Sequence, residues 1–190
     1  EHGTSHISIV DTQGRWLSMT SSIEDRFGSR LLIRGVLMNN QLTDFSFVPT
    51  QNDLPVANRV GPGKRPRSAM SPTILINGEG RPVLAMGSPG GSRILGFNAR
   101  VLSAYIAGVH DAGKLVSLPM ALNRNGPSEV ERTLGRDAIA ELKARGHVVK
   151  VVDMASGHGV IVRRGSTLQG AADPRREGQE IGRASCRERV

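Results

Sequence analysis

The chain has 190 residues, of which 38% are hydrophobic, 22% charged and only 3% aromatic, so we expect one globular domain with an aliphatic core. Its most apolar stretch is interrupted by Asn98 and Arg100, which excludes a membrane-spanning helix. The single Cys excludes a disulfide framework and a Cys-based zinc site, and the five His show no metal-ligand spacing. We therefore expect neither a metal nor a cofactor.

The C-terminal residues 180–190 are expected to be foreign to the protein, because they back-translate into a common sequencing-adapter sequence. They carry three Arg, two Glu and the Cys, so without them the net charge falls from +8 to +7. Since the chain opens without Met, we also expect it to be part of a longer reading frame. The basic charge suits an anionic partner, but no aromatic residue lies beside Lys64, Arg65 and Arg67, which disfavours nucleic-acid binding.

The N-terminal part of the chain predicts a β-hairpin. Residues alternate between polar and apolar over 6–10, a turn follows at 11–14, and a second strand is expected over 15–21. A third strand is expected over 31–38. The polar, Pro-rich stretch 39–71 then predicts one long loop, and loops of that length in compact domains are usually functional.

The middle of the chain predicts a second hairpin and a long helix. The hairpin has strands over 73–76 and 82–86 around an Asn-Gly-Glu-Gly turn. The helix is expected over 93–112, where apolar residues recur at helical spacing, and Gly113 is expected to end it. Its expected core positions are Ile94, Leu95, Val101, Leu102, Tyr105, Ile106 and Val109.

The C-terminal part predicts a helix over 129–145, ending at Gly146, and then strands. Two strands are expected over 147–152 and 159–164, and a third over 168–171. Strands in a block, helices in a block and strands again indicate the α+β class rather than alternating βαβ units.

The first candidate for chemistry is Thr4-Ser5-His6, at the head of the first strand. A Thr hydroxyl is a weak nucleophile unless a base lies beside it. Cleavage between Gly3 and Thr4 would give Thr4 a free α-amine, whose pKa of about 8 suits deprotonation of its own hydroxyl. By themselves, the three residues equally describe an ordinary start of a strand.

The second candidate is the glycine-rich turn Gly87-Ser88-Pro89-Gly90-Gly91-Ser92-Arg93, between a predicted strand and a predicted helix. Backbone N–H groups in such a turn can point at an anion, and the helix dipole favours negative charge there. The Lys-Ser/Thr of a P-loop is missing. Two N–H groups could instead form an oxyanion hole for acyl transfer, and a plain turn is the alternative.

The third candidate is a polar cluster from Asn39 to Ser46, continued by the stretch from Pro62 to Thr73. Gln41 and Asp44 could receive an ammonium group, and Ser68 could donate to a carboxylate. The alternative is a turn followed by a solvated basic face.

In their order along the chain and in their residues, the three motifs resemble the small, catalytic subunit of the gamma-glutamyltransferase family (glutathione hydrolases), within the N-terminal-nucleophile hydrolases. The resemblance runs from Thr4 to the Gly-Ala-Ala-Asp-Pro-Arg at 170–175. It implies a large-subunit tail over 1–3, a self-cleavage site after Gly3 and a small-subunit domain over 4–179. The implied fold is a four-layer αββα sandwich, incomplete without the large subunit from the same precursor.

The resemblance also implies the activity and its residues. Thr4 would form an acyl-enzyme with the γ-glutamyl group of glutathione or a related compound, which water or an amino acid then resolves. The catalytic residues implied are Thr4, Thr20, Ser22, Gly90 and Gly91. The substrate-binding residues implied are Glu24, Gln41 and Asp44 for the α-amine and Ser68 for the α-carboxylate.

This sequence departs from the family's pattern at Ala69, where the second of two carboxylate-binding serines is expected. Losing a hydrogen bond to a charged group costs about 1.5–3 kcal/mol, or roughly ten- to a hundredfold in affinity. Two alternatives therefore stay open: an acylase for a different acyl amide, and an inactive paralogue that serves as an interaction module. The resemblance further implies export to the periplasm or beyond, and poor stability of the chain without its large subunit.

Overall fold

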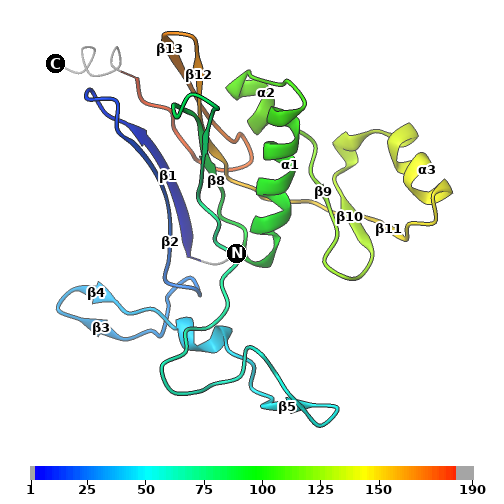
Figure 1. Ribbon diagram of the computed structural model, residues 1–190. Helices are drawn as coiled ribbons and strands as arrows, with labels where there is room; N and C mark the ends of the chain where they lie inside the picture. The colour runs from blue at the N-terminus through cyan, green and yellow to red at the C-terminus, as the bar shows by residue number, and fades with distance from the viewer. Residues whose placement is uncertain (1–2, 183–190) are drawn as a thin grey trace.

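The computed structural model describes residues 3–182, so most of the segment expected to be foreign, from 183 on, lies outside the described residues. The central elements form three layers (Figure 1): a two-stranded hairpin, a four-stranded sheet, and two helices on the far side of that sheet, while a third helix and a small second sheet lie apart from these layers. This mixture of helix and strand confirms the expected α+β class. The chain thus supplies three layers of the expected sandwich, with its two sheets face to face.

The hairpin consists of β1 (Thr4–Val10) and β2 (Trp16–Ser22), as predicted. Its polar side chains face the four-stranded sheet, where Ser8 Oγ donates to the carbonyl of Gly159 and Ser18 Oγ to that of Met86. Its opposite face is exposed and mainly apolar, with Ile7, Ile9, Leu17 and Met19 flanked at one end by two serines. The alternation therefore runs polar-in and apolar-out, the reverse of an ordinary surface hairpin.

The four-stranded sheet is antiparallel, in the order β13–β12–β8–β7. Its strands are β7 (Thr73–Ile76), β8 (Pro82–Gly87), β12 (Gly159–Arg164) and β13 (Thr167–Ala172), which confirms the strands predicted in these regions. The core lies between this sheet and the helices, and includes the fully buried Leu84, Met86, Phe97, Val101, Val160 and Val162. As expected, it is mainly aliphatic.

The single helix predicted over 93–112 is wrong, because the structure has two helices, α1 (Ile94–Ile106) and α2 (Ala112–Val116). Gly108, at φ 100°, stops α1. Asp111 then caps α2 by accepting from the Lys114 N–H at 2.8 Å, so the expected stop, Gly113, lies inside a helix. Ile106, expected in the core, is 70% exposed.

The helix predicted over 129–145 is also shorter than expected. Residues 128–130 pair as a strand instead, and Gly135 at φ 93° separates them from α3 (Arg136–Ala144), which ends before Gly146 as predicted. The remaining elements here are β9 (Ala121–Leu122), β10 (Ser128–Val130), η3 (Arg132–Leu134) and β11 (Val149–Val151), which form a small sheet in the order β11–β10–β9. The strand expected over 147–152 is thus reduced to residues 149–151.

Two small hairpins project between β2 and β7 (Figure 1). The first, β3 (Leu32–Ile33) and β4 (Val36–Leu37), replaces the single strand predicted over 31–38, because Arg34 and Gly35 adopt positive φ and turn the chain. The stretch 39–71 also has structure of its own. It contains η1 (Gln41–Asp44), β5 (Thr50–Gln51) and β6 (Leu54–Pro55). Within residues 3–182, no helix has the length and apolar character needed to cross a bilayer.

Candidate active site

Thr4 is the first residue of β1 and pairs with Ser22, the last residue of β2. Its Oγ1 lies 2.8 Å from Ser22 Oγ, which also accepts from the backbone N–H of Glu24. The preceding residue, Gly3, is held on both sides. Its N–H donates to Glu24 at 3.0 Å and its carbonyl accepts from Ile23 at 3.1 Å. The peptide before Thr4 is therefore fixed beside the Thr4 hydroxyl.

His6 lies on the same face of β1 as Thr4 and orders the hydroxyl groups around it. Ser8 donates to the Gly159 carbonyl, so it can only accept from His6 Nε2–H, at 3.0 Å. His6 Nδ1 is then the acceptor for the Thr20 hydroxyl, at 2.8 Å. Burial, and next the charge of His158, lower the pKa of His6 to about 4, so the ring is neutral at pH 7.

A pair of glycines makes room for this imidazole. Gly87 at the end of β8 pairs directly with Gly159 at the start of β12. A Cβ at Gly87 would overlap the His6 ring, whereas a Cβ at Gly159 would lie 3.4 Å from His6 Cδ2, an ordinary contact. The His6 ring thus fits into a notch in the sheet, and only Gly87 must lack a side chain to leave room for it. We name these two residues the glycine notch.

The glycine-rich turn follows β8 directly and leads into α1. Gly90 and Gly91 both have positive φ, 141° and 59°, which favours glycine, and a Cβ at Gly90 would lie only 2.6 Å from Phe97 Cε2. Within the described part of the chain, neither glycine donates its N–H to a protein acceptor. A pocket of about 230 Å³ is lined by both Thr4 and Pro89 of this turn. The unused donors therefore lie at the positive end of a helix, and the pocket that Thr4 lines reaches Pro89, the residue directly before them.

The residues expected to bind substrate lie in two groups. Glu24 follows β2, and its carboxylate accepts from Asn40 Nδ2 at 2.7 Å. Gln41 and Asp44 lie in η1, where Gln41 Nε2 donates to Asp44 Oδ2 at 2.8 Å. Ser68 lies in the exposed stretch before β7, and its hydroxyl accepts from Met70 N–H in its own turn. The side chains expected to bind the amine are thus held by hydrogen bonds to other side chains. The hydrogen bond of Ser68 reaches only the backbone two residues further on.

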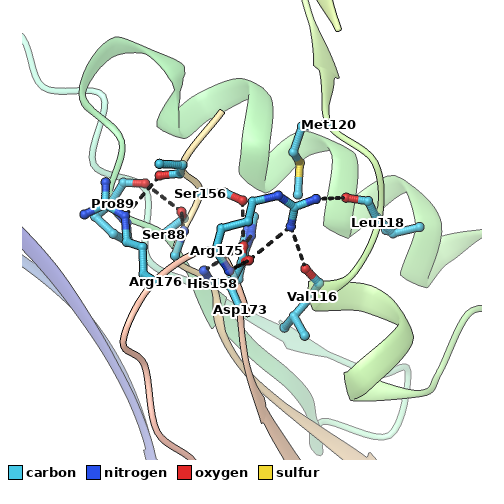
Figure 2. Close-up of polar contacts among 12 residues, drawn as sticks. Ser88, Pro89, Val116, Leu118, Met120, Ser156, His158, Asp173, Arg175 and Arg176 are labelled. Carbon is cyan, nitrogen blue, oxygen red and sulfur yellow. Dashed lines mark hydrogen bonds and ion pairs between the residues drawn. The ribbon is translucent and has the colours of Figure 1, made fainter. Parts of the chain in front are cut away.

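A buried polar cluster beside the turn was not anticipated from the sequence (Figure 2). Asp173, 2% exposed, accepts from Ser156 Oγ at 2.6 Å and from the Arg175 backbone and guanidinium. Burial raises the pKa of Asp173, but the close contacts of its carboxylate with His158, Ser156 and Arg175 outweigh it and lower the pKa to about 2. The Asp173 side chain is therefore a buried carboxylate at neutral pH.

His158 completes this cluster and also lines the pocket that holds Thr4. It is 1% exposed, and its Nδ1 lies 3.5 Å from Asp173 Oδ2. Neither ring nitrogen has a hydrogen-bond partner among residues 3–182. No group of three His, Cys, Asp or Glu that could hold a metal ion was found in that same range. The only sequence signal for the cluster is a charged Asp-Pro-Arg-Arg directly after a strand.

Known proteins share this architecture. Residues 1–183 match the family model described as gamma-glutamyltranspeptidase. The glutathione hydrolase proenzyme of Bacillus subtilis is 32% identical over 188 residues, 96% of this chain and 31% of its own length. The chain thus spans about a third of the length of that curated relative.

Solved structures agree with this match. The T380A mutant of Helicobacter pylori gamma-glutamyltranspeptidase has a TM-score of 0.79 at 29% identity, covering 90% of this chain and 99% of that chain. A cephalosporin acylase from Bacillus halodurans has the same TM-score at 26% identity, covering 92% of this chain and 33% of that chain.

Proposed function

Because the chain belongs to the gamma-glutamyltranspeptidase family, we propose that it is the catalytic part of a γ-glutamyl hydrolase and transpeptidase with Thr4 as nucleophile. One observation carries the proposal: the Thr4 hydroxyl is bonded to Ser22, and Thr4 lines a pocket that Pro89 of the glycine-rich turn also lines. A nucleophile beside unused N–H donors is the arrangement that acyl transfer needs.

Maturation is proposed to begin at the peptide between Gly3 and Thr4. The Thr4 hydroxyl adds to the Gly3 carbonyl carbon, and the C–N bond breaks as the acyl group moves from nitrogen to oxygen. Water then hydrolyses this ester, leaving a carboxylate on Gly3 and a free α-amine on Thr4. The bonds that hold Gly3 to Ile23 and Glu24 support this step, because they restrain the scissile peptide beside the attacking oxygen.

Turnover uses the amine that maturation releases. The α-amine, with a pKa of about 8, takes the hydroxyl proton as Oγ1 attacks the γ-carbonyl of the substrate. The N–H groups of Gly90 and Gly91 stabilise the resulting oxyanion. The proton passes to the leaving amine, and an ester to Thr4 remains. Water or an amino acid then attacks this ester, with the same amine as base, and releases glutamate or a new γ-glutamyl amide.

Thr20 and Ser22 are proposed to orient the nucleophile. Thr20 donates its proton to the neutral His6, so its oxygen keeps lone pairs for an N–H of the α-amine of Thr4. Ser22 bonds directly to the attacking oxygen. Glu24, Gln41 and Asp44 are proposed to bind the substrate ammonium, and Ser68 the α-carboxylate.

A large subunit from the same precursor is the proposed partner. Its support is the apolar outer face of the hairpin, where Ile7, Ile9, Leu17 and Met19 are each more than 40% exposed. We further propose that the enzyme acts in the periplasm or outside the cell, which fractionation of cells that express the whole precursor would test.

The experiment for the proposed function is mass spectrometry and an activity assay of the whole precursor. We expect a new chain that begins at Thr4, and release of aniline from a γ-glutamyl anilide. A Thr4→Ala variant should stay uncut and inactive. A wild-type precursor that also stays intact and inactive would contradict the proposal and favour the interaction-module alternative.

A second candidate, an acylase for a different acyl amide, is favoured by Ala69 and by the similarity to the cephalosporin acylase. Ala69 lacks the hydroxyl expected beside Ser68. A substrate whose acyl group has no α-carboxylate would therefore lose no hydrogen bond at this position. Comparing kcat/KM for a γ-glutamyl anilide and a glutaryl anilide separates the two functions. An Ala69→Ser variant of a γ-glutamyl enzyme should gain about ten- to a hundredfold on the first substrate alone.

A further inference from the structure

Ser88 belongs to the glycine-rich turn, but its hydroxyl lies inside the protein. Ser88 is fully buried, and its Oγ donates to the carbonyl of Pro89 at 2.6 Å (Figure 2). The same oxygen accepts from the backbone N–H of Gly157 at 3.0 Å. One hydroxyl therefore ties the turn to the segment that precedes β12.

The bond to Pro89 fixes the direction of a functional N–H group. The peptide between Pro89 and Gly90 is planar and trans, so its C=O and N–H point in opposite directions. Because the Pro89 carbonyl points toward the buried Ser88, the Gly90 N–H points away from it. Gly90 has no Cβ to limit its backbone rotation, so it does not fix the orientation of the preceding peptide. The hydrogen bond from the Ser88 hydroxyl to the Pro89 carbonyl restrains that peptide instead.

The other partner of Ser88 is held just as firmly. Gly157 lies between Ser156 and His158, and Asp173 Oδ2 accepts from the Ser156 hydroxyl at 2.6 Å and from the His158 backbone at 3.4 Å. Asp173 in turn is bound by Arg175, which makes a bidentate pair with Glu131 at 2.7 and 2.8 Å. Asp173, itself held by Arg175, therefore anchors the chain on both sides of Gly157, whose N–H bonds to Ser88.

We propose that Ser88 is a positioning residue: its hydroxyl holds the Pro89–Gly90 peptide so that the Gly90 N–H faces the developing oxyanion. This inference rests on the proposed function, since it concerns the donor that Gly90 supplies to the acyl-transfer step. It adds a residue that touches neither substrate nor nucleophile, yet sets the geometry of the transition-state contact.

The test compares Ser88→Ala with Ser128→Ala in the whole precursor. Both serines are buried and both variants lose one hydroxyl, but only the Ser88 hydroxyl bonds to Pro89, whereas that of Ser128 contacts Asn123 and His147. We expect Ser88→Ala to lower kcat on a γ-glutamyl anilide by roughly ten- to a hundredfold, with KM within twofold, because a displaced oxyanion donor acts only in the transition state. Binding of a tetrahedral γ-boronate analogue should weaken by a similar factor.

Ser128→Ala should keep kcat within about threefold, and Ser88→Thr, which keeps a hydroxyl, should recover part of the loss. Equal losses of kcat in Ser88→Ala and Ser128→Ala, or a Ser88→Ala enzyme as fast as the wild type, would overturn the inference. If Ser88→Ala is not cleaved, its melting temperature is compared with that of uncut Thr4→Ala. An equal value supports the inference, and a value lower by more than about 5 °C overturns it, because misfolding then explains the block.

Failure of the inference and failure of the proposed function give different results. A wild-type precursor without cleavage or activity refutes the proposed function. An active wild type with an equally active Ser88→Ala refutes only the role of Ser88.

Discussion

Thr4 Oγ1 lies 2.8 Å from Ser22 Oγ, across the last residue pair of the hairpin. Ser22 also accepts from the Glu24 N–H, so its own proton is free to be shared with Thr4. This contact between two hydroxyl groups links the attacking oxygen to the loop that carries Glu24, and the first prediction tests it.

Replacing Ser22 by Ala should lower kcat by roughly three- to tenfold, because a neutral hydrogen bond to the nucleophile contributes about 0.5–1.5 kcal/mol. Ser22→Thr keeps the hydroxyl and should stay close to the wild type. Ser21→Ala, on the exposed face of the same strand, is the matched control. The measurement is steady-state kinetics of the matured enzyme, and an equal effect of Ser21→Ala would contradict the prediction.

The glycine notch predicts an asymmetry between two glycines that pair with each other. Gly87→Ala places a Cβ on the His6 ring and should lower the free energy of unfolding by about 1–3 kcal/mol. Gly159→Ala makes only an ordinary contact with the same ring and should cost less than about 1 kcal/mol. Chemical denaturation of the whole precursor checks both values. If the clash is the cause, a His6→Ala change should remove most of the Gly87→Ala penalty, and a purely additive double variant would refute it.

The lowered pKa of His6 predicts acid sensitivity. The unfolded chain binds a proton to His6 near pH 6.5, while the folded protein does so only near pH 4. The free energy of unfolding should therefore fall as the pH drops from about 6.5 to 4, by at most about 3 kcal/mol from this group. Asp173, with its pKa near 2, loses its contribution only below this window.

The measurement is chemical denaturation at pH 7 and pH 4.5 of uncut Thr4→Ala precursors with and without His6→Asn. The variant with Asn should lose less stability between the two pH values. An equal loss in both proteins would show that other groups cause the acid sensitivity.

Arg175 is predicted to be the most important cation for stability. All of its N–H groups have acceptors, on Glu131, Asp173 and the carbonyls of Val116 and Leu118. Arg175→Ala leaves two largely buried carboxylates without their cation and should cost about 3–5 kcal/mol.

The matched control is Arg145→Ala, which removes an exposed ion pair with Glu141 and should cost less than about 0.5 kcal/mol. Thermal and chemical unfolding of the precursors measure the difference. Similar costs for the two variants would refute the assigned importance of the buried network.

The sequence predicted the hairpin and the four-stranded sheet well, because strict alternation and turn residues are local signals. It predicted the helices less well. Helical spacing continues past Ile106, but Gly108 and the cap at Asp111 divide the segment. Glu129 also fits a helical pattern, yet its segment pairs with β11 instead, since tertiary pairing overrides local propensity.

In the candidate site, too, residues in short motifs could be predicted from the sequence, while residues that depend on contacts distant along the chain could not. Thr4, Gly90 and Gly91 belong to short motifs that can be recognised along the chain. Ser88 and Asp173 gain their roles from distant partners, because Gly157 lies 69 residues from Ser88 and Arg175 lies 44 residues from Glu131. No spacing pattern in a single sequence reveals such contacts.

The position of Thr4 at the very start of β1 has a consequence for a newly made chain end. Chain termini are usually the least ordered part of a protein. A cut before Thr4 would remove only the two backbone hydrogen bonds of Gly3 and would leave all seven residue pairs of the ribbon intact. The new N-terminus at Thr4 would therefore already be held by strand pairing with Ser22 when it forms, so it would not fray as chain ends usually do.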